Sequence, residues 1–320
     1  MVRSYDIFNG DADGLCALHQ LRLEAPCVTE LVTGVKREIA LLERVDARAG
    51  DVLTVLDVSM KSNAAALERV LERGARVRYF DHHSPGDIPE HPALEAHIDT
   101  APTVCTSLIV DRHIGGRQRA WAVVAAFGDN LVQSAIAAAQ PLNLDHTELA
   151  RLHELGECLN YNAYGESTAD LHYHPADLYQ AIRPYPDPRH FIFDEPVFNV
   201  LRAAYAEDLF RANELNAYVA SDQAALFVLP DAAWSRRING LFANRLAQNF
   251  PKRAHAVLVT RQNGYAVSVR APIERPHGAA ALCERFETGG GREGAGGIDH
   301  LASADLDRFA SAFREAFSRV

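Results

Sequence analysis

Short apolar runs alternate with stretches of helical periodicity through the first half of the chain, and this alternation is the feature that most constrains the fold. Parallel strands need a crossover between them, and a helix usually provides it. We therefore predict an α/β fold whose N-terminal domain contains a doubly wound, mostly parallel sheet. The expected strands are residues 5–9, 28–32, 52–57 and 76–81, and the expected helices between them are residues 15–24, 37–45 and 64–72.

The remainder of the chain first becomes mostly helical and then alternates again. A stretch rich in proline and aromatic residues, 172–196, is expected to be a surface loop, and the helical pattern that resumes at residue 198 is expected to be a connector. The other predicted helices are residues 120–128, 131–139, 146–161, 231–249, 278–286 and 304–317. The other predicted strands are residues 224–229, 255–260 and 265–270, followed by a glycine-rich turn at 289–297.

Two domains are expected, because 320 residues exceed the usual size of a single domain. The predicted boundaries give an N-terminal domain at residues 1–193, a helical connector at 194–221 and a smaller C-terminal α/β domain at 222–320. A cleft is expected between the two domains.

Net charge limits the kind of partner. A formal charge of −10 argues against a protein that binds long nucleic acid through a broad basic surface, because such binding requires many lysine and arginine contacts. A short anionic substrate is still compatible with it, since local cations and bound metal ions set the field in a cleft. We expect neither long duplex nucleic acid nor a membrane among the partners.

Five dispersed cysteines, with none at CxxC spacing, favour neither a disulfide framework nor a zinc site. No apolar run approaches the ~18 residues of a membrane-spanning helix, and the first eight residues are more typical of a strand than of a signal peptide. The prediction is a cytoplasmic protein.

Carboxylates and imidazoles follow three of the predicted strands. The first strand runs into the sequence NGDADG, the third ends in an aspartate, and the fourth ends in an aspartate followed by two histidines. Because the carboxyl ends of parallel strands meet at one edge of a sheet, we expect these side chains to converge. They are Asp11, Asp13, Asp57, Asp81, His82 and His83.

Each of these aspartates could alone be a helix cap or part of a turn. Together, with no lysine or arginine close to them in sequence, they would repel one another unless a cation lay between them. Carboxylates with one or two imidazoles suit manganese, with magnesium or iron as alternatives. Two such ions about 4 Å apart would activate a water molecule and bind phosphoryl oxygens, which points to phosphate-ester hydrolysis.

These residues resemble the motifs of the DHH phosphoesterase superfamily, which includes RecJ-type exonucleases, nano-RNases, cyclic dinucleotide phosphodiesterases and exopolyphosphatases. Residues 9–14 resemble the first motif, Asp57 in TVLDVSM the second, Asp81 with the two following histidines the third, and Asp129 in AFGDN the fourth. Asp129 is selected by the resemblance alone. The resemblance spans nearly the whole chain and implies a metal-dependent phosphoesterase with a DHH domain at residues 1–193.

The C-terminal domain is similar to the DHH-associated substrate-binding domain. The GGGH motif of that domain reads Gly289, Gly290, Gly291 and Arg292 here, and its glycines would let backbone amides approach a phosphate or base. A flexible surface loop is the alternative interpretation. Arg270 in VSVRAP resembles the arginine with which family members hold a substrate phosphate, a role that suits a planar fork of donors.

Two residues depart from the family pattern. Asn9 stands where many relatives have histidine, and an amide could bind a metal, orient water or only form hydrogen bonds. Arg292 replaces the last histidine of the GGGH motif. Both departures bear on which substrate is used.

The resemblance also implies individual roles. Asp57 would bridge two ions, Asp11 with Asn9 would complete one of them, and Asp13, His82 and Asp129 would complete the other. Asp81 would orient the ring of His82, and His83 would contact the phosphate or support the ligands. The predicted metal ligands are Asn9, Asp11, Asp13, Asp57, Asp81, His82 and Asp129. The predicted catalytic residues are Asp57, His82 and His83, and the predicted substrate-binding residues are Arg270, Gly289, Gly290, Gly291 and Arg292.

The expected substrate is a linear dinucleotide, such as the one produced from cyclic diguanylate, or a short oligonucleotide, cleaved to mononucleotides. An exopolyphosphatase or pyrophosphatase is the alternative, because polyphosphate-cleaving relatives also have asparagine in the first motif. A metal-binding sensor without turnover is a third interpretation. The sequence leaves open the base preference, the polarity of cleavage, the native metal and the oligomeric state, a homodimer included.

Overall fold

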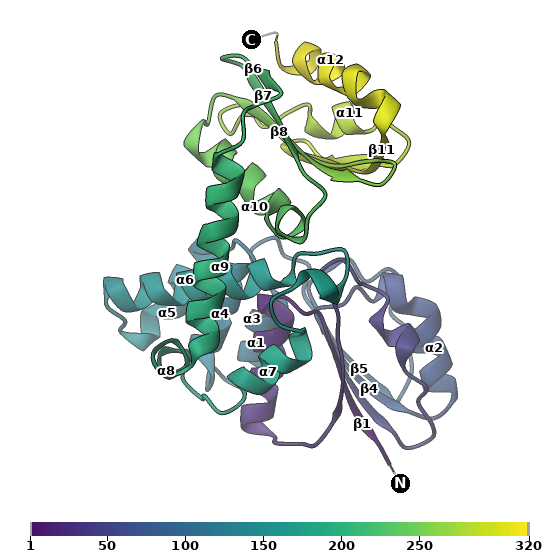
Figure 1. The fold of residues 1–320 in the computed structure, drawn as a ribbon. Coiled ribbons are helices and arrows are strands. Elements are labelled where there is room, and N and C mark those ends of the chain that lie inside the picture. Colours follow the sequence, from purple (N-terminus) through teal and green to yellow (C-terminus); the bar gives the residue numbers. More distant parts are fainter. Residues whose placement is uncertain (1, 319–320) are drawn as a thin grey trace. The chain divides into compact units, whose positions relative to one another are not determined.

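The computed structural model describes residues 2–318. The chain divides into two compact units, the first ending at Ala203 and the second starting at Ala204, so the boundary falls within helix α9 (Pro196–Asn213) (Figure 1). No helix among the described residues combines the length and the apolar character needed to cross a bilayer.

The N-terminal unit is built on a five-stranded parallel sheet with the order β2-β1-β3-β4-β5. Its strands are β1 (Ser4–Phe8), β2 (Glu30–Val32), β3 (Val52–Leu56), β4 (Arg76–Asp81) and β5 (Leu94–Ile98). The chain moves from β1 outward to β2 and then returns to the other side of β1. The strand order therefore reverses between β1 and β3, and ligands of open α/β sheets bind at such a switch point.

Helices cover both faces of this sheet, which confirms the predicted doubly wound fold (Figure 1). Helix α2 (Ala64–Glu72) packs its Leu67 and Val70 against Ile7 and Val55 of the strands on one face. The remaining helices of the unit are α1 (Ala12–Glu24), α3 (Thr106–His113), α4 (Arg119–Gly128), α5 (Val132–Ala139), α6 (His146–Ala163), α7 (Pro175–Ile182) and α8 (Pro188–Asp194).

Helix α4 is almost completely buried, and its carboxyl end positions the fourth motif. A β-carbon on Gly128 would lie 2.4 Å from the β-carbon of Ala12 and 2.8 Å from the carbonyl oxygen of Gly156. Glycine therefore allows α4 to approach α1 and α6 closely at this point. Asp129, the next residue, ends α4 beside the start of α1.

The second unit contains a six-stranded sheet with the order β10-β11-β9-β8-β7-β6, in which only β7 and β8 are parallel. Its strands are β6 (Val219–Ala220), β7 (Ala224–Leu229), β8 (Ala254–Arg261), β9 (Gly264–Arg270), β10 (Gly289–Arg292) and β11 (Ala295–Ala302). Helices α11 (Ala279–Cys283) and α12 (Leu306–Phe317) share a core with Leu226 of β7. The neighbouring Phe227 contacts Phe242 of α10 (Ala233–Asn249), so α10 covers the opposite face.

Three sequence predictions are wrong. The helix expected at 37–45 is only a short 3-10 turn at Leu41–Arg44. The loop expected at 172–196 contains α7 and α8, each with a proline at its first position, where proline is well tolerated. The turn expected at 289–297 is an antiparallel hairpin formed by β10 and β11. The prediction also missed β5 and α3.

Candidate active site

The predicted ligands of the N-terminal unit meet at the carboxyl edge of its sheet. Asp57 follows β3 directly, Asp81 ends β4, and the first motif joins β1 to α1. Ligand atoms of Asp57, His82 and His83 lie within 4.8 Å of one another, and so do those of Asp13, His82 and Asp129. The site therefore lies at the switch point of the sheet.

His82 faces two carboxylates with its Nε2. Its Nδ1 donates a hydrogen bond to the carbonyl oxygen of Val104 at 3.0 Å, so in the neutral imidazole the lone pair lies on Nε2. That Nε2 lies 3.4 Å from Oδ1 of Asp57 and 3.9 Å from Oδ2 of Asp129. A backbone carbonyl commonly fixes metal-binding histidines in this orientation.

The predicted role of Asp81 as the residue that orients the ring of His82 is wrong, because Val104 makes that contact. Oδ1 of Asp81 instead accepts hydrogen bonds from Nδ1 of His83 at 2.7 Å and from the backbone N–H of His82 at 2.9 Å. The hydrogen bond to Asp81 raises the pKa of the half-exposed His83. Oδ2 of Asp81 is buried and has no hydrogen-bond partner among the described residues.

Asp57 occupies a strained and electrostatically unfavourable position. Its φ of 56° is in the left-handed region, which side chains other than glycine rarely adopt, and Thr106 donates a hydrogen bond to its Oδ1 at 3.1 Å. Burial, followed by the charges of Asp11, Asp13 and Asp129, raises its pKa well above the ordinary value. A divalent cation would relieve this repulsion, so the donor set fits a metal ion.

Two residues of the first motif also serve as helix caps. Oδ1 of Asp11 accepts hydrogen bonds from the backbone N–H groups of Asp13 and Gly14 at the start of α1. Both carboxylate oxygens of Asp13 accept backbone hydrogen bonds of 2.7 Å from Thr106 and Ser107, the first two residues of α3. Capping and convergence are therefore both present at these aspartates.

Both the oxygen and the nitrogen of the Asn9 side chain form hydrogen bonds with the backbone. Its Oδ1 accepts a hydrogen bond from the backbone N–H of Asp11 at 3.3 Å, and its Nδ2 donates to the carbonyl oxygen of Lys36 at 3.2 Å. Of the roles considered for this residue, hydrogen bonding to the backbone is the one that these contacts support.

Lys36 is a site residue that the sequence interpretation missed. Its Nζ lies 2.6 Å from Oδ2 of Asp11 and 3.4 Å from Oδ1 of Asp129. Burial disfavours the ammonium form, but Asp11, Tyr164 and Asp129 more than offset this, so the pKa of Lys36 lies well above its ordinary value. The available signal was topological, because the residue follows β2, which neighbours β1, at the same edge of the sheet.

In the C-terminal unit, two of the predicted substrate-binding residues lie in one row of the sheet. Ala295 of β11 pairs with Arg270 of β9 on one side and with Arg292 of β10 on the other. Directly paired residues point to the same face, and two strand spacings separate the arginines by roughly 10 Å. Nε of Arg270 donates a hydrogen bond to Oδ1 of Asn244 in α10 at 2.6 Å.

The three glycines of β10 are not equivalent. A β-carbon on Gly289 would lie 1.8 Å from the carbonyl oxygen of Cys283, and Gly291 has a φ of 150° with the Ala295 carbonyl oxygen 2.5 Å from its β-carbon position. A β-carbon on Gly290 would meet nothing within 4 Å. Packing and backbone conformation therefore explain two of the glycines, and only Gly290 offers open backbone for a ligand.

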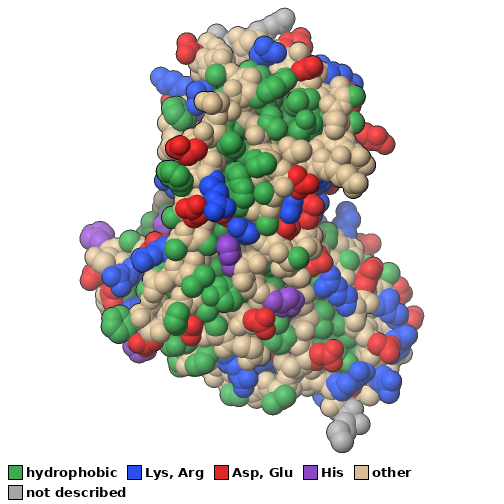
Figure 2. Space-filling view, viewed as in Figure 1, with side chains coloured by type: hydrophobic (Ala, Val, Ile, Leu, Met, Phe, Trp, Pro, Cys, Tyr) green, Lys and Arg blue, Asp and Glu red, His purple; other side chains and the backbone are tan. Residues whose placement is uncertain are grey.

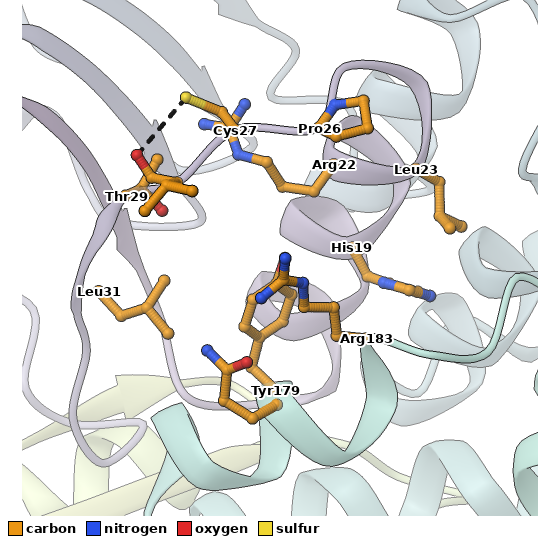
Figure 3. Close-up of a pocket in the computed structure, with 11 residues that line it drawn as sticks. His19, Arg22, Leu23, Pro26, Cys27, Thr29, Leu31, Tyr179 and Arg183 are labelled. Carbon is orange, nitrogen blue, oxygen red and sulfur yellow. Dashed lines mark hydrogen bonds between the residues drawn. The ribbon is translucent and has the colours of Figure 1, made fainter.

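A surface cavity of about 420 Å³ lies elsewhere in the N-terminal unit, between the carboxyl half of α1, β2 with the segment before it, and α7 (Figure 3). His19, Arg22 and Arg183 contribute its basic side chains, and Arg22 is paired with Asp6. None of the predicted ligands lines this cavity.

No family model matches the chain, and no curated protein matches its sequence. Solved structures do match its fold. The exonuclease RecJ bound to manganese superimposes with a TM-score of 0.60 at 16% identity, over 99% of this chain and 90% of that one. The DHH domain of a protein described as a member of a family of ribosomal proteins gives a TM-score of 0.64 at 12% identity, with coverages of 98% and 86%.

A third match is the pGpG-specific phosphodiesterase PggH from Vibrio cholerae, with a TM-score of 0.55 at 14% identity over 98% of each chain. The chain therefore has the fold of the DHH-domain proteins, which confirms at the level of the fold the resemblance that its motifs indicated.

Proposed function

We propose that this protein is a metal-dependent phosphodiesterase that hydrolyses a linear dinucleotide or short oligonucleotide to mononucleotides. The observation that carries the proposal is the meeting of the Nε2 lone pair of His82 with the carboxylates of Asp13, Asp57 and Asp129 at the switch point of the sheet. Manganese is the expected ion, since oxygen and imidazole donors suit it and RecJ of similar fold was solved with manganese bound.

A divalent ion held by these four residues would polarise a phosphoryl oxygen and lower the pKa of its water molecule. The protein contributes positioning. Val104 fixes the tautomer of His82, and Thr106 holds the carboxylate of Asp57. The hydrogen bond from Nδ1 of His83 to Asp81 raises the pKa of this half-exposed ring and so favours the imidazolium form, whose Nε2 would donate a hydrogen bond to a phosphate oxygen.

Features of the second unit support a short anionic substrate. Arg270 and Arg292 would bind a phosphate from one face of the sheet, and the backbone of Gly290 is accessible beside them. On the face shown in Figure 2, basic and acidic side chains are interspersed, and no continuous basic surface is visible there. The similarity of fold to the pGpG-specific phosphodiesterase PggH favours a dinucleotide within this class of substrates.

The test is a substrate panel incubated with manganese: a 5′-phosphorylated dinucleotide, a cyclic dinucleotide, a longer RNA and polyphosphate, with products separated by chromatography. The wild type is compared with Asp57→Asn and with the control Asp87→Asn, which changes an exposed aspartate outside the cluster. We expect preferential conversion of the dinucleotide to mononucleotides by the wild type and by the control only. Preferential release of orthophosphate from polyphosphate would favour the alternative function, an exopolyphosphatase. If no substrate of the panel were turned over, the proposal that the protein is an enzyme would be rejected.

A further inference from the structure

We infer that the ammonium group of Lys36 replaces one of the two divalent ions, so that the site binds a single divalent ion tightly and uses Lys36 as its second positive centre. The inference rests on the proposed function and concerns the number of bound ions, which the sequence predicts to be two.

The contacts of the ammonium group form a complete set. Nζ of Lys36 lies 2.6 Å from Oδ2 of Asp11, 3.4 Å from Oδ1 of Asp129 and 3.2 Å from Oδ1 of Asn160. A lysine ammonium has three hydrogens to donate, and these are three oxygen acceptors. The group also lies 5.8 Å from the centre of the Tyr164 ring, a distance at which cation and ring attract.

The backbone of Lys36 is fixed on both sides, so the side chain starts from a defined point. Its N–H donates to the carbonyl oxygen of Ala163 at the end of α6 at 2.9 Å. Its carbonyl oxygen accepts the hydrogen bond from Asn9, the residue that stands where many relatives have histidine. The first motif therefore holds Lys36 through the residue in which it departs from the family pattern.

The same contacts remove the ligands that the resemblance assigned to one ion. Both ends of the Asn9 amide are engaged with the backbone, one oxygen of Asp11 caps α1, and the other binds Lys36. Only Asp57 would be left for that ion. Among the ligands assigned to the other ion, both oxygens of Asp13 also accept backbone hydrogen bonds, but from neutral donors. A ligand atom of Asp13 still lies within 4.8 Å of those of His82 and Asp129, and Asp57 lies 3.4 Å from His82.

The contacts place positive charge on both sides of one carboxylate. Asp129 separates the two positive centres, because its Oδ1 faces Lys36 and its Oδ2 faces His82. The substrate phosphate would then meet one metal ion and one fixed ammonium group.

Manganese stoichiometry and electron paramagnetic resonance test this without measuring activity. Two adjacent Mn²⁺ ions give a spin-coupled spectrum, whereas a lone ion gives six uncoupled lines. We expect one tight equivalent with uncoupled lines for the wild type, and a second equivalent with a coupled signal for Lys36→Met. Lys61→Met, which changes an exposed lysine, is the matched control and should behave as the wild type does.

All titrations use a His113→Ala background, because the ligand atoms of Glu95, His97 and His113 also lie within 4.8 Å of one another and could bind an additional ion. A coupled pair in the protein that retains Lys36 would overturn the inference, and so would a single ion in both proteins. Failure of the proposed function would look different, since neither protein would bind manganese tightly or cleave any substrate of the panel.

Discussion

Nε2 of His82 lies 3.4 Å from Oδ1 of Asp57, and in the neutral imidazole the hydrogen bond from Nδ1 of His82 to Val104 leaves the lone pair on that Nε2. A lone pair and a carboxylate oxygen that face each other form a poor hydrogen-bonded pair and a good pair of metal ligands. This relationship is the basis of the proposed metal centre, and several consequences can be measured.

Replacement of Asp57 by asparagine should stabilise the metal-free protein. The charged carboxylate is buried among other aspartates, and asparagine removes the charge while tolerating the positive φ. We expect the free energy of unfolding at pH 7 in EDTA to rise by on the order of 1 kcal/mol, measured by urea denaturation. Added manganese should then stabilise the wild type and leave the variant unchanged. If the variant were less stable than the wild type in EDTA, other groups of the protein would already stabilise the charge of Asp57 without a metal ion.

The two neighbouring histidines should separate metal binding from turnover. His82→Gln removes a metal ligand and should weaken manganese binding at least about 10-fold. His83→Gln should leave manganese affinity within about 3-fold and lower kcat about 100-fold, because its side chain contacts Asp81 and the expected phosphate position. Isothermal titration and initial rates decide this, and equal losses of manganese affinity in both variants would contradict the assignment.

Two glycines of β10 provide a matched pair. Gly289→Ala forces a β-carbon against the carbonyl oxygen of Cys283 and should lower the free energy of unfolding by about 2 kcal/mol or more. Gly290→Ala has open space and should leave stability within about 0.5 kcal/mol, while raising KM for the dinucleotide by about 10-fold. An unchanged KM in Gly290→Ala would remove this strand from the substrate site.

Stability should fall in mild acid because of His19. This imidazole is buried against Trp121, and its Nε2 donates a hydrogen bond to the carbonyl oxygen of Tyr185 at 2.8 Å. Burial lowers its pKa from 6.5 to about 4. The unfolded chain therefore takes up a proton near pH 6.5 and the folded chain only near pH 4, so the stabilisation is complete above pH 6.5 and is lost as the pH falls through 4.

The loss from this group should amount to about 3 kcal/mol at the acid limit, since one pKa unit corresponds to about 1.4 kcal/mol. Urea denaturation between pH 7.5 and 4.5 measures it, and His19→Gln, which keeps a donor for Tyr185, should make the dependence shallower. The buried His255, whose pKa burial also lowers to about 4, should retain its own share. An equally steep dependence in the variant would assign the acid sensitivity to other groups.

Thiol chemistry should distinguish Cys27 from the other four cysteines. Cys27 is exposed beside the cavity of the N-terminal unit, whereas Cys16, Cys105, Cys158 and Cys283 are buried. A thiol reagent should modify one equivalent in the native protein and five in urea, and Cys27→Ser should remove the native reaction. Two or more fast equivalents in the native protein would contradict the buried positions.

Much of the N-terminal sheet could be predicted because its strands are short apolar runs that end in polar motifs. Helix α2 and strand β4 occur at the predicted residues. Strand β5 was missed because Leu94–Ile98, at the edge of the sheet, includes glutamate and histidine and lacks a buried apolar run. Proline and aromatic residues suggested a loop at 172–196, although proline at a first helical position favours a helix start.

The convergence of the aspartates and His82 was predictable from the rule that strand ends share an edge. The position of Lys36 was not, since its contact with Asp11 depends on how the segment after β2 returns over the end of β1. The orientation of His82 by a backbone carbonyl likewise has no sequence signal, because Val104 is 22 residues away and contributes no side-chain chemistry.

The most direct test of the metal centre is an anomalous-scattering map collected at the manganese edge from crystals of the wild-type protein soaked in Mn²⁺. We expect a strong peak about 2.2 Å from both Nε2 of His82 and the carboxylate of Asp57, with Asp13 and Asp129 completing the site. A map without a peak at His82, from crystals in which manganese is bound elsewhere on the chain, would contradict the account.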